Sequence, residues 1–389
     1  MKSLSQITET FTESVIREMT RISDSCEGIN MSQGFPDFES PEAIRNAAIE
    51  AINNHHNQYP ITFGEKELRE AIALKAHSYN KINCNPINEI TVTCGATEAM
   101  IATLKAIINP GDEIIIFEPF YENYGPDGIL SGAKPCYVKL HAPEWKYNID
   151  ELRKAFNKNT KAIIINTPNN PTGKVFSKNE LSEIAQLCIE WDAYAITDEI
   201  YEHILYDGSE HISLATLPGM RERTITINSI SKTYSVTGWR VGWAIASAPI
   251  TERIRKVHDF LTVGAPTPLQ HAAVHALNFP ETYYQELQKK YLTARAYMLE
   301  TLNIAGFKPF IPKGAYYIMA DAENLFNEFK AENDYDFAKK LIEKTRVATV
   351  PGFSFYKGKN TITKQVRFAF CKKPQTLEMV RNLFETHLK

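Results

Sequence analysis

The chain has 389 residues, which is enough for two domains with sizeable hydrophobic cores. With 23% charged and 43% hydrophobic residues its composition is that of a globular protein, and a net charge of −3 gives no electrostatic reason to expect a nucleic acid or an anionic membrane as partner. None of the six cysteines forms a C-x-x-C pair, which disfavours a structural zinc site, and the N-terminus lacks the apolar segment of a secretory signal, so we expect free thiols in a cytoplasmic protein.

Helical and strand-like patterns alternate from about Pro41 to about Pro266, which indicates a parallel or mixed sheet covered by helices. The first of these helices is expected to have Ser40 as its N-cap and Pro41 at its first position. Short β-branched runs bounded by turn residues predict buried strands. These runs are residues 89–94, 112–117, 162–167, 193–198 and 223–228.

The pattern changes after about residue 270. Residues 280–306 predict one long helix that ends near Gly306. Strand-like segments at 315–321, 347–352 and 365–370, a helix around 334–345 and a final helix follow it, which indicates a smaller α+β domain. We therefore predict an N-terminal arm (1–35) that packs with the small domain, a large ligand-binding domain (36–280) and a small C-terminal domain (281–389).

Polar side chains follow three successive strands of the large domain. Ligands of open α/β sheets bind at the carboxyl ends of the strands, so Asn170, Asp198, Tyr201, Ser229 and Lys232 are expected to meet in one pocket. An Asp and a Lys that lie in one pocket could simply form a salt bridge. For any single pair of this kind, a salt bridge is the more common explanation. The accompanying Asn, Tyr and glycine-rich turn favour a second explanation, in which Lys232 forms a Schiff base with a carbonyl cofactor.

Pyridoxal phosphate has a functional group for each of these side chains. Its aldehyde suits Lys232, its ring nitrogen suits the carboxylate of Asp198, and its phenolic oxygen suits donors such as Tyr201 and Asn170. Its phosphate suits backbone N–H groups at the start of a helix. Residues 89–107 provide such a start, where a strand runs through Gly95 into a helix that begins with Ala96 and Thr97. The sequence has no G-x-G-x-x-G motif, which disfavours a dinucleotide.

The motifs NTPNNPTG, TDEIYEH and SISKTYSVTGWRVGW, which follow one another in this order along the chain, resemble the class I/II aminotransferases of pyridoxal phosphate fold type I. The resemblance extends from about Gln33 to Arg367, and within the family the chain is similar to methionine aminotransferases and kynurenine–glutamine aminotransferases. It implies an α/β fold: a large domain that binds the cofactor on a mainly parallel central sheet flanked by helices, and a smaller α+β domain. It also implies a homodimer with the active site near the interface.

The resemblance implies a role for individual residues. Lys232 would bind the cofactor covalently and move the proton, Asp198 would bind the ring nitrogen, and Tyr201 with Asn170 would bind the phenolic oxygen. Arg367 would bind the substrate carboxylate, because a guanidinium can donate two hydrogen bonds in one plane. The remaining implied cofactor residues are Gly95, Ala96, Thr97, Ser229 and Arg240 at the phosphate, Tyr121 on the ring, and Tyr59 reaching the phosphate of the neighbouring subunit. The remaining implied substrate residues are Asn170, Gly34, Phe35 and Tyr121.

The implied reaction moves the amino group of an L-amino acid to a 2-oxo acid in two half-reactions. Methionine or an aromatic amino acid is the favoured donor, because we find no second cation for a side-chain carboxylate in the sequence. Phe35, Tyr124 and Tyr316 are expected in the pocket wall. The segments VPGFSFY and KGAYYIMAD look more like the aspartate and broad-specificity branch, so that branch remains an alternative.

Three other functions are alternatives to an aminotransferase. A cysteine-conjugate β-lyase would share every cofactor residue. A transcriptional regulator built on this fold would need an added DNA-binding module, and a non-catalytic binding module would not need Asn170, Asp198, Tyr201 and Lys232 together. His271 and His275 are four residues apart on a predicted helix, but we expect no metal there.

Overall fold

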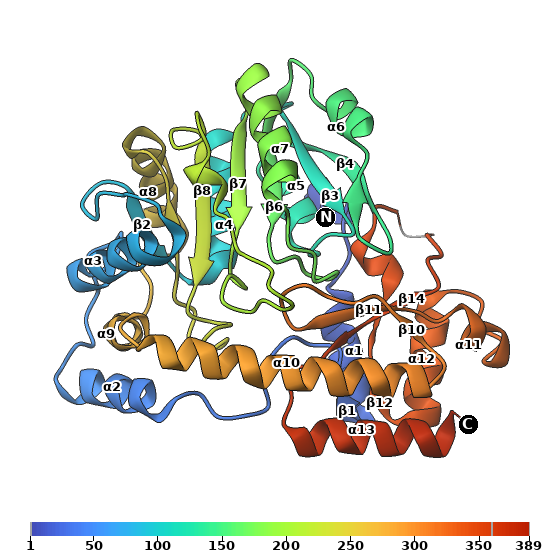
Figure 1. Ribbon diagram of the computed structural model, residues 1–389. Coiled ribbons are helices and arrows are strands. Elements are labelled where there is room, and N and C mark those ends of the chain that lie inside the picture. The colour runs from blue at the N-terminus through green and yellow to red at the C-terminus, as the bar shows by residue number, and fades with distance from the viewer. Residues whose placement is uncertain (1, 359–360, 389) are drawn as a thin grey trace.

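The computed structural model describes residues 2–358 and 361–388, and an eight-stranded sheet forms its centre (Figure 1). The strand order is β2-β9-β8-β7-β6-β3-β4-β5. The strands from β8 to β4 pair in parallel, whereas β9 pairs antiparallel with both β2 and β8, and β5 pairs antiparallel with β4. The strands are β2 (Ile90–Thr93), β3 (Glu113–Glu118), β4 (Lys134–His141), β5 (Lys146–Tyr147), β6 (Thr160–Asn166), β7 (Tyr194–Asp198), β8 (Thr224–Ser229) and β9 (Gly242–Ile245).

The central strands are buried on both faces, as their continuous β-branched sequences predict. Ile114 and Ile164 pack in one hydrophobic cluster with residues of α4, and Ile115 and Ile163 pack in another with residues of α7. Figure 1 shows these two helices on opposite sides of the sheet. The helices of this part are α2 (Glu42–Asn53), α3 (Lys66–Lys75), α4 (Gly95–Ile107), α5 (Tyr124–Leu130), α6 (Ile149–Ala155), α7 (Lys178–Glu190), α8 (Ala248–Thr262) and α9 (Thr267–Leu277).

The five strands predicted in the large domain are all present, and one helix start is corrected. The N-cap of α2 is Pro41, not Ser40, because Pro41 has an extended ψ of 133° and the helix begins at Glu42. The strand β9 was not predicted as a partner of β8. It returns antiparallel beside β8, so the turn that carries Lys232 connects two adjacent strands of the sheet.

A second, four-stranded antiparallel sheet has the order β10-β11-β14-β13. Its core is rich in aromatic side chains, among them Phe307, Phe337, Phe368 and Phe384. Its strands are β10 (Lys308–Pro309), β11 (Tyr317–Asp321), β13 (Val350–Pro351) and β14 (Gln365–Ala369). The helices of this part are α10 (Glu281–Ile304), α11 (Glu323–Glu328), α12 (Asp334–Thr345) and α13 (Pro374–His387).

The helix α10 is the long helix that the sequence predicts, and in Figure 1 it runs from the neighbourhood of α9 to the four-stranded sheet. The N-terminal segment contains α1 (Val15–Ser25) and β1 (Ile29–Asn30), and β1 pairs in parallel with β12 (Val347–Ala348). The division of the chain after residues 35 and 280 stays a prediction.

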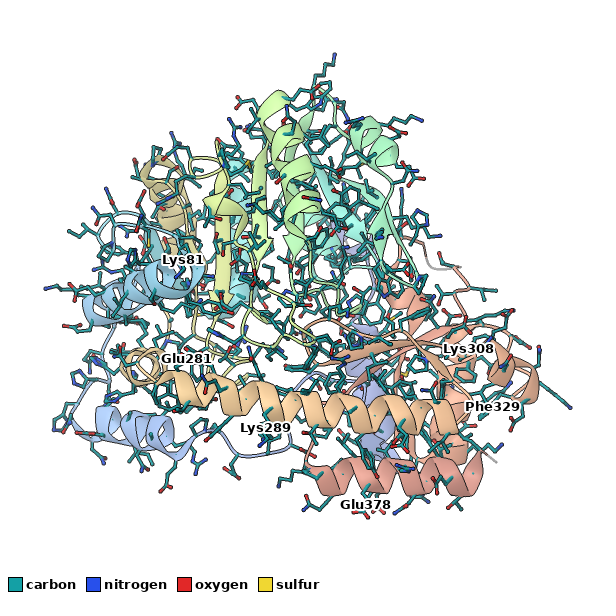
Figure 2. All side chains as sticks on the ribbon, in the orientation of Figure 1. Lys81, Glu281, Lys289, Lys308, Phe329 and Glu378 are labelled. Carbon is teal, nitrogen blue, oxygen red and sulfur yellow. The ribbon has the colours of Figure 1, made fainter. Side chains whose placement is uncertain are left out.

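The surface carries charged side chains, as Figure 2 shows for Glu281 and Lys289 on α10 and for Glu378 on α13. Across residues 2–358 and 361–388, no helix is both long enough and apolar enough to cross a membrane.

Candidate active site

A cavity of about 760 Å³ lies at the carboxyl ends of β6, β7 and β8. Residues of the N-terminal segment and of β14 close it, so segments far apart in the sequence form one site. The structure brings most of the predicted site residues together there. The predicted residues that line the cavity are Gly34, Phe35, Ala96, Thr97, Tyr121, Tyr124, Asn170, Asp198, Tyr201, Ser229, Lys232, Arg240 and Arg367.

Three predicted residues do not line the cavity of this chain. Gly95 lies directly behind it, where a Cβ atom would come within 2.3 Å of the Arg240 guanidinium. Tyr59 lies outside it and is 85% exposed. Tyr316 is buried behind the wall and donates a hydrogen bond to the carbonyl oxygen of Gly34 at 3.0 Å, whereas the next residue, Tyr317, lines the cavity. The prediction for Tyr316 was therefore wrong by one residue: Tyr316 directly precedes β11, and the first residue of that strand, Tyr317, lines the cavity instead.

Lys232 lies in the turn between β8 and β9, which places its amine inside the cavity. Its Nζ donates a hydrogen bond to the carbonyl oxygen of Gly34 at 3.1 Å and lies 5.8 Å from the ring centroid of Tyr201. Burial lowers the pKa of this amine to about 8. A larger share of the amine is therefore neutral, and so nucleophilic, near pH 7 than for an exposed lysine.

Asp198 is the last residue of β7, and its carboxylate lies in the cavity. The Tyr124 hydroxyl donates a hydrogen bond to its Oδ2 at 2.7 Å. Burial raises the pKa of Asp198 to about 6, and the hydrogen bond from Tyr124 partly opposes this rise. A cationic group placed beside this carboxylate would offset the cost of its burial.

Two asparagines at the ends of the neighbouring strands hold the backbone around Asp198. The amide of Asn166 donates to the carbonyl oxygen of Asp198 at 3.0 Å, and the amide of Asn228 donates to that of Glu199 at 3.2 Å. The Asn166 side chain also accepts a hydrogen bond from the backbone N–H of Asn170 at 2.6 Å. One side chain therefore connects Asp198 with the turn that carries Asn170.

Arg367 lies on β14 and is only 1% exposed. Its Nη1 donates to the side-chain oxygen of Asn170 at 2.7 Å, and its Nη2 donates to the carbonyl oxygen of Ser32. Its Nε is buried and has no hydrogen-bond partner among the described residues. A buried guanidinium with no carboxylate partner and a free donor is suited to binding a carboxylate.

The opposite end of the cavity contains donors for a second anion. The helix α4 begins there at Gly95, whose φ of 80° is available at little cost only to glycine. Arg240 lies against this helix start and donates to the carbonyl oxygen of Thr237 at 3.0 Å. The hydroxyl of Ser231 lines the cavity and has no partner among the described residues, a donor that the sequence prediction missed in favour of Ser229.

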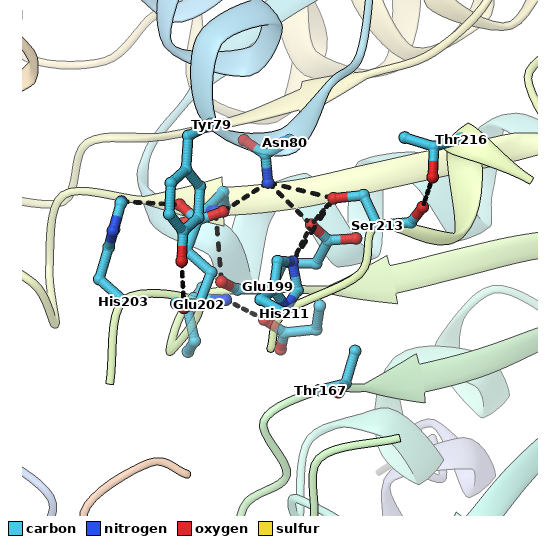
Figure 3. Close-up of polar contacts among 12 residues, drawn as sticks. Tyr79, Asn80, Thr167, Glu199, Glu202, His203, His211, Ser213 and Thr216 are labelled. Atoms are coloured by element: carbon cyan, nitrogen blue, oxygen red, sulfur yellow. Dashed lines mark hydrogen bonds and ion pairs between the residues drawn. The ribbon is translucent and has the colours of Figure 1, made fainter. Parts of the chain in front are cut away.

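A buried network of polar side chains lies behind the end of β7 (Figure 3). The Glu199 carboxylate accepts hydrogen bonds from Ser213 at 2.6 Å and Asn80 at 3.3 Å, and contacts His211 at 2.7 Å. In the described part of the chain, Glu199, Glu202 and His211 are the residues whose spacing could suit a metal ion, but the ammonium of Lys75 already pairs with Glu202. We therefore interpret the network as support for the peptide that follows Asp198.

The sequence analysis missed several residues of the site, and only some of them had a signal in the sequence. Tyr317 could have been found from strict alternation along β11, and Asn166 from its position as the last residue of a predicted strand. Arg17 and Gln33 line the cavity from the N-terminal segment. No sequence pattern connects these two residues with the strand ends, because their contact with the cavity depends on the tertiary path of the N-terminal segment.

Comparison with known proteins agrees with this geometry. The family model described as aminotransferase class I and II matches residues 27–383. Kynurenine–oxoglutarate transaminase 3 of Mus musculus is 36% identical over 392 residues, which cover 94% of this chain and 86% of the relative. Aspartate aminotransferase of Pyrococcus abyssi is 39% identical over 332 residues, which cover 85% of this chain and 84% of the relative.

Solved structures of aminotransferases are also similar to this chain. N-succinyldiaminopimelate aminotransferase from Mycobacterium tuberculosis has a TM-score of 0.94 at 33% identity, covering 99% of this chain and 100% of that one. YbdL from Escherichia coli, which has a methionine aminotransferase function, has a TM-score of 0.92 at 31% identity with the same coverage. These similarities confirm the predicted fold, fold type I of the pyridoxal-phosphate-dependent transferases. The chain belongs to the class I and II aminotransferase family, and it is an aminotransferase.

Proposed function

We propose that this aminotransferase uses pyridoxal phosphate to move the amino group of an L-amino acid, methionine or an aromatic one, to a 2-oxo acid. The observation that carries the proposal is the presence in one cavity of a lysine with a lowered pKa, a buried aspartate and a buried arginine without a carboxylate partner. A purely structural role explains the three poorly, because within the described residues none of these groups has an ion-pair partner of opposite charge and the Nε of Arg367 also has no hydrogen-bond partner.

The residues present fit pyridoxal phosphate. Lys232 would hold the aldehyde, Asp198 the ring nitrogen, and Tyr201 with Asn170 the phenolic oxygen. The Ser231 hydroxyl without a partner leaves a donor for a phosphate, and Gly95, which has no Cβ atom, lets the Arg240 guanidinium approach the start of α4. Ser229, Arg240, Ala96 and Thr97 would complete that site. When bound, the cofactor supplies an electron sink for the pair of electrons left at the substrate α-carbon after deprotonation.

The side chains of this chain supply the remaining parts of the reaction. Arg367 and Asn170 would bind the substrate carboxylate and so orient its α-carbon. The Nζ of Lys232 would accept the α-proton and return it, since a pKa of about 8 suits proton transfer near neutral pH. The ionised carboxylate of Asp198 would keep the ring nitrogen of the cofactor in its protonated, cationic form. Tyr121 would cover the ring, and Tyr124 would keep the Asp198 carboxylate oriented.

The cavity wall supports an apolar or aromatic side chain on the donor. Ile16, Phe35, Tyr121, Leu261 and Tyr317 all line it. The names of the relatives point to kynurenine, methionine and aspartate, so they support the reaction more strongly than any one donor.

A homodimer belongs to the same proposal. Tyr59 and Phe260 are 85% and 92% exposed in the single chain, and Leu261, which lines the cavity, is 42% exposed. A second copy would cover these apolar side chains and would bring its own Tyr59 to the phosphate site of this chain. We also retain the three segments 1–35, 36–280 and 281–389 as the proposed organisation.

The test is the visible absorption spectrum of the purified protein before and after addition of L-methionine, with no 2-oxo acid present. The proposal predicts a yellow band that bleaches as the cofactor accepts the amino group, with a 2-oxo acid as product. A band that does not respond to methionine would reject the donor and leave the cofactor in place. Pyruvate and ammonia from a cysteine conjugate, without bleaching, would indicate a β-lyase, and no band after addition of pyridoxal phosphate would refute the proposal.

A further inference from the structure

We propose that His258 is a positioning residue for the cofactor phosphate: as a buried cation it neutralises the carboxylate of Glu98, so that the start of α4 can bind a second anion. The inference rests on the proposed function, which places a phosphate at this helix start. Glu98 lines the cavity, whereas His258 does not, so the histidine acts through the glutamate that it contacts.

His258 lies on the face of α8 that packs against α4. Ile254, His258 and Thr262 are spaced four residues apart, so they share one face of the helix. Ile254 belongs to a hydrophobic cluster that also contains residues of α4. One turn later His258 is fully buried, and its partner Glu98 is only 7% exposed. A pair of titratable groups therefore continues an otherwise apolar contact between the two helices.

The carboxylate of Glu98 has three partners on its two oxygens. Its Oε1 lies 2.6 Å from the Nδ1 of His258 and accepts a hydrogen bond from the Thr262 hydroxyl at 2.7 Å. Its Oε2 accepts from the backbone N–H of Cys94, the N-cap of α4, at 2.5 Å. Glu98 therefore holds the residue from which the helix starts, and His258 holds Glu98.

The partners of the imidazole show that it is a cation. Its Nε2 lies 2.7 Å from the carbonyl oxygen of Thr62, which can only accept, so Nε2 carries a proton. Its Nδ1 faces a carboxylate that already accepts two other hydrogen bonds, so Nδ1 donates as well. Burial alone would lower the pKa of His258, but the hydrogen bond and charge of Glu98 outweigh burial and raise it. Burial alone would likewise raise the pKa of Glu98, but His258 and the other donors lower it.

Glu98 without its cation would oppose a phosphate at this place. The carboxylate lies in the first turn of α4, where the free N–H groups and the helix dipole attract an anion. An unpaired negative charge there would repel the phosphate and offset the attraction of Arg240, which lies against the same helix start. With His258 protonated the pair is neutral, and the full charge of Arg240 acts on the phosphate.

Helix packing alone does not account for the pair. Apolar side chains of similar volume often replace a buried ion pair without loss of stability, and α8 already uses Ile250 and Ile254 in this way. The second contact of the imidazolium also leads to a phosphate site. Thr62 belongs to the segment 59–64, which carries Tyr59, the residue proposed to reach the phosphate of the neighbouring subunit.

The experiment compares the affinity of the full-length apoprotein for pyridoxal phosphate and for pyridoxal, which lacks only the phosphate. The ratio of the two dissociation constants, measured by absorbance, isolates the contribution of the phosphate. The variants are His258→Gln, Glu98→Gln and the double variant, which removes both charges. The matched control is His275→Gln, the same substitution at an exposed histidine of α9 that does not line the cavity. Thermal melting checks that each variant is folded.

The expected result is a loss confined to the variant in which Glu98 keeps its charge without a cation. His258→Gln should weaken pyridoxal phosphate about 10- to 100-fold and leave pyridoxal nearly unchanged. Glu98→Gln, the double variant and His275→Gln should keep the wild-type ratio within about threefold. This non-additive pattern is what a charge effect produces, because the double variant restores neutrality without restoring the contacts.

Two results would overturn the inference and leave the proposed function standing. One is an equal loss for both aldehydes in His258→Gln, and the other is a double variant whose ratio falls as far as that of His258→Gln. If His258→Gln does not fold, the double variant alone decides the question. A wild-type apoprotein that forms an adduct with neither aldehyde would instead refute the proposed function.

Discussion

The side chain of Asn166 connects the two halves of the site, because it donates to the carbonyl oxygen of Asp198 at 3.0 Å and accepts from the N–H of Asn170 at 2.6 Å. Asn170 in turn accepts a hydrogen bond from Arg367 at 2.7 Å. The groups proposed for the cofactor and for the substrate carboxylate are therefore held in a fixed relation by one buried amide.

Replacement of Asn166 by Ala should impair catalysis more than substrate binding. Loss of its two hydrogen bonds frees the Asp198 peptide and the Asn170 turn, so we expect kcat to fall about 10- to 100-fold. Steady-state kinetics measures the split between kcat and KM, and Asn166→Asp, which keeps only the acceptor, should lie between Ala and the wild type. A loss confined to thermal stability, with kcat unchanged, would contradict this positioning role.

The lowered pKa of Lys232 predicts how cofactor uptake depends on pH. Only the neutral amine attacks an aldehyde, so below pH 8 the rate at which the apoprotein incorporates pyridoxal phosphate should rise about tenfold per pH unit. Above about pH 8 the rate should level off, because the amine is then mostly neutral. Absorbance after rapid mixing measures this rate, and a midpoint near the ordinary lysine pKa of about 10.4 would contradict the assignment.

Asp198→Asn should stabilise the apoprotein while it inactivates the enzyme. Because burial raises the carboxyl pKa to about 6, the folded state binds the proton more tightly than the unfolded state, and the free energy of unfolding falls as the pH rises from about 4 to about 6. The Asn variant lacks this penalty, so at pH 7 it should be more stable by roughly 1–3 kcal/mol, with no difference below about pH 4.

Chemical denaturation of the two apoproteins at pH 4 and pH 7 measures the effect of Asp198→Asn. The same variant should lose at least about 100-fold in kcat once the cofactor is added, since a neutral amide no longer holds a ring cation. An Asn variant that is less stable at both pH values would show that the Asp198 carboxylate is a structural ion instead.

Arg367→Lys should weaken the binding of every substrate by a similar factor. Lysine keeps the charge but cannot serve Asn170, the Ser32 carbonyl oxygen and a ligand carboxylate in one plane. We expect KM to rise about 10- to 100-fold for amino acids and 2-oxo acids alike, whether or not they have a second carboxylate. An increase limited to dicarboxylic acids would instead place Arg367 at the substrate side chain.

Tyr59→Ala should leave the fold intact, because the side chain is 85% exposed in the single chain. It should nevertheless weaken the affinity for pyridoxal phosphate about tenfold if this tyrosine reaches the neighbouring subunit. Titration of the apoprotein with the cofactor measures the affinity, and sedimentation checks that the variant is still a dimer. Unchanged affinity in an intact dimer would remove Tyr59 from the site.

Much of the sheet could be predicted from the sequence, because parallel strands buried on both faces are continuous β-branched runs. The same rule placed Asn170, Asp198 and Lys232 at one edge of the sheet, since each follows such a run. It failed for β9, whose sequence GWAI is short and lacks a β-branched run, and for the choice between Tyr316 and Tyr317.

Residues that reach the site from distant segments could not be predicted in this way. Arg17 belongs to a helix that precedes the first predicted element, and its contact with the cavity depends on the path of the N-terminal segment. The hydrogen bond from Tyr124 to Asp198 joins residues 74 positions apart and leaves no local pattern. These contacts follow from tertiary packing, which periodicity does not describe.

The most direct test of the central claim is to reduce the holoenzyme with borohydride, digest it and map the modified peptide by mass spectrometry. Our account predicts that reduced pyridoxal phosphate is attached to Lys232, and that Lys232→Ala carries none. Attachment at another lysine, or the absence of a covalent adduct in cofactor-saturated protein, would contradict the account and the function derived from it.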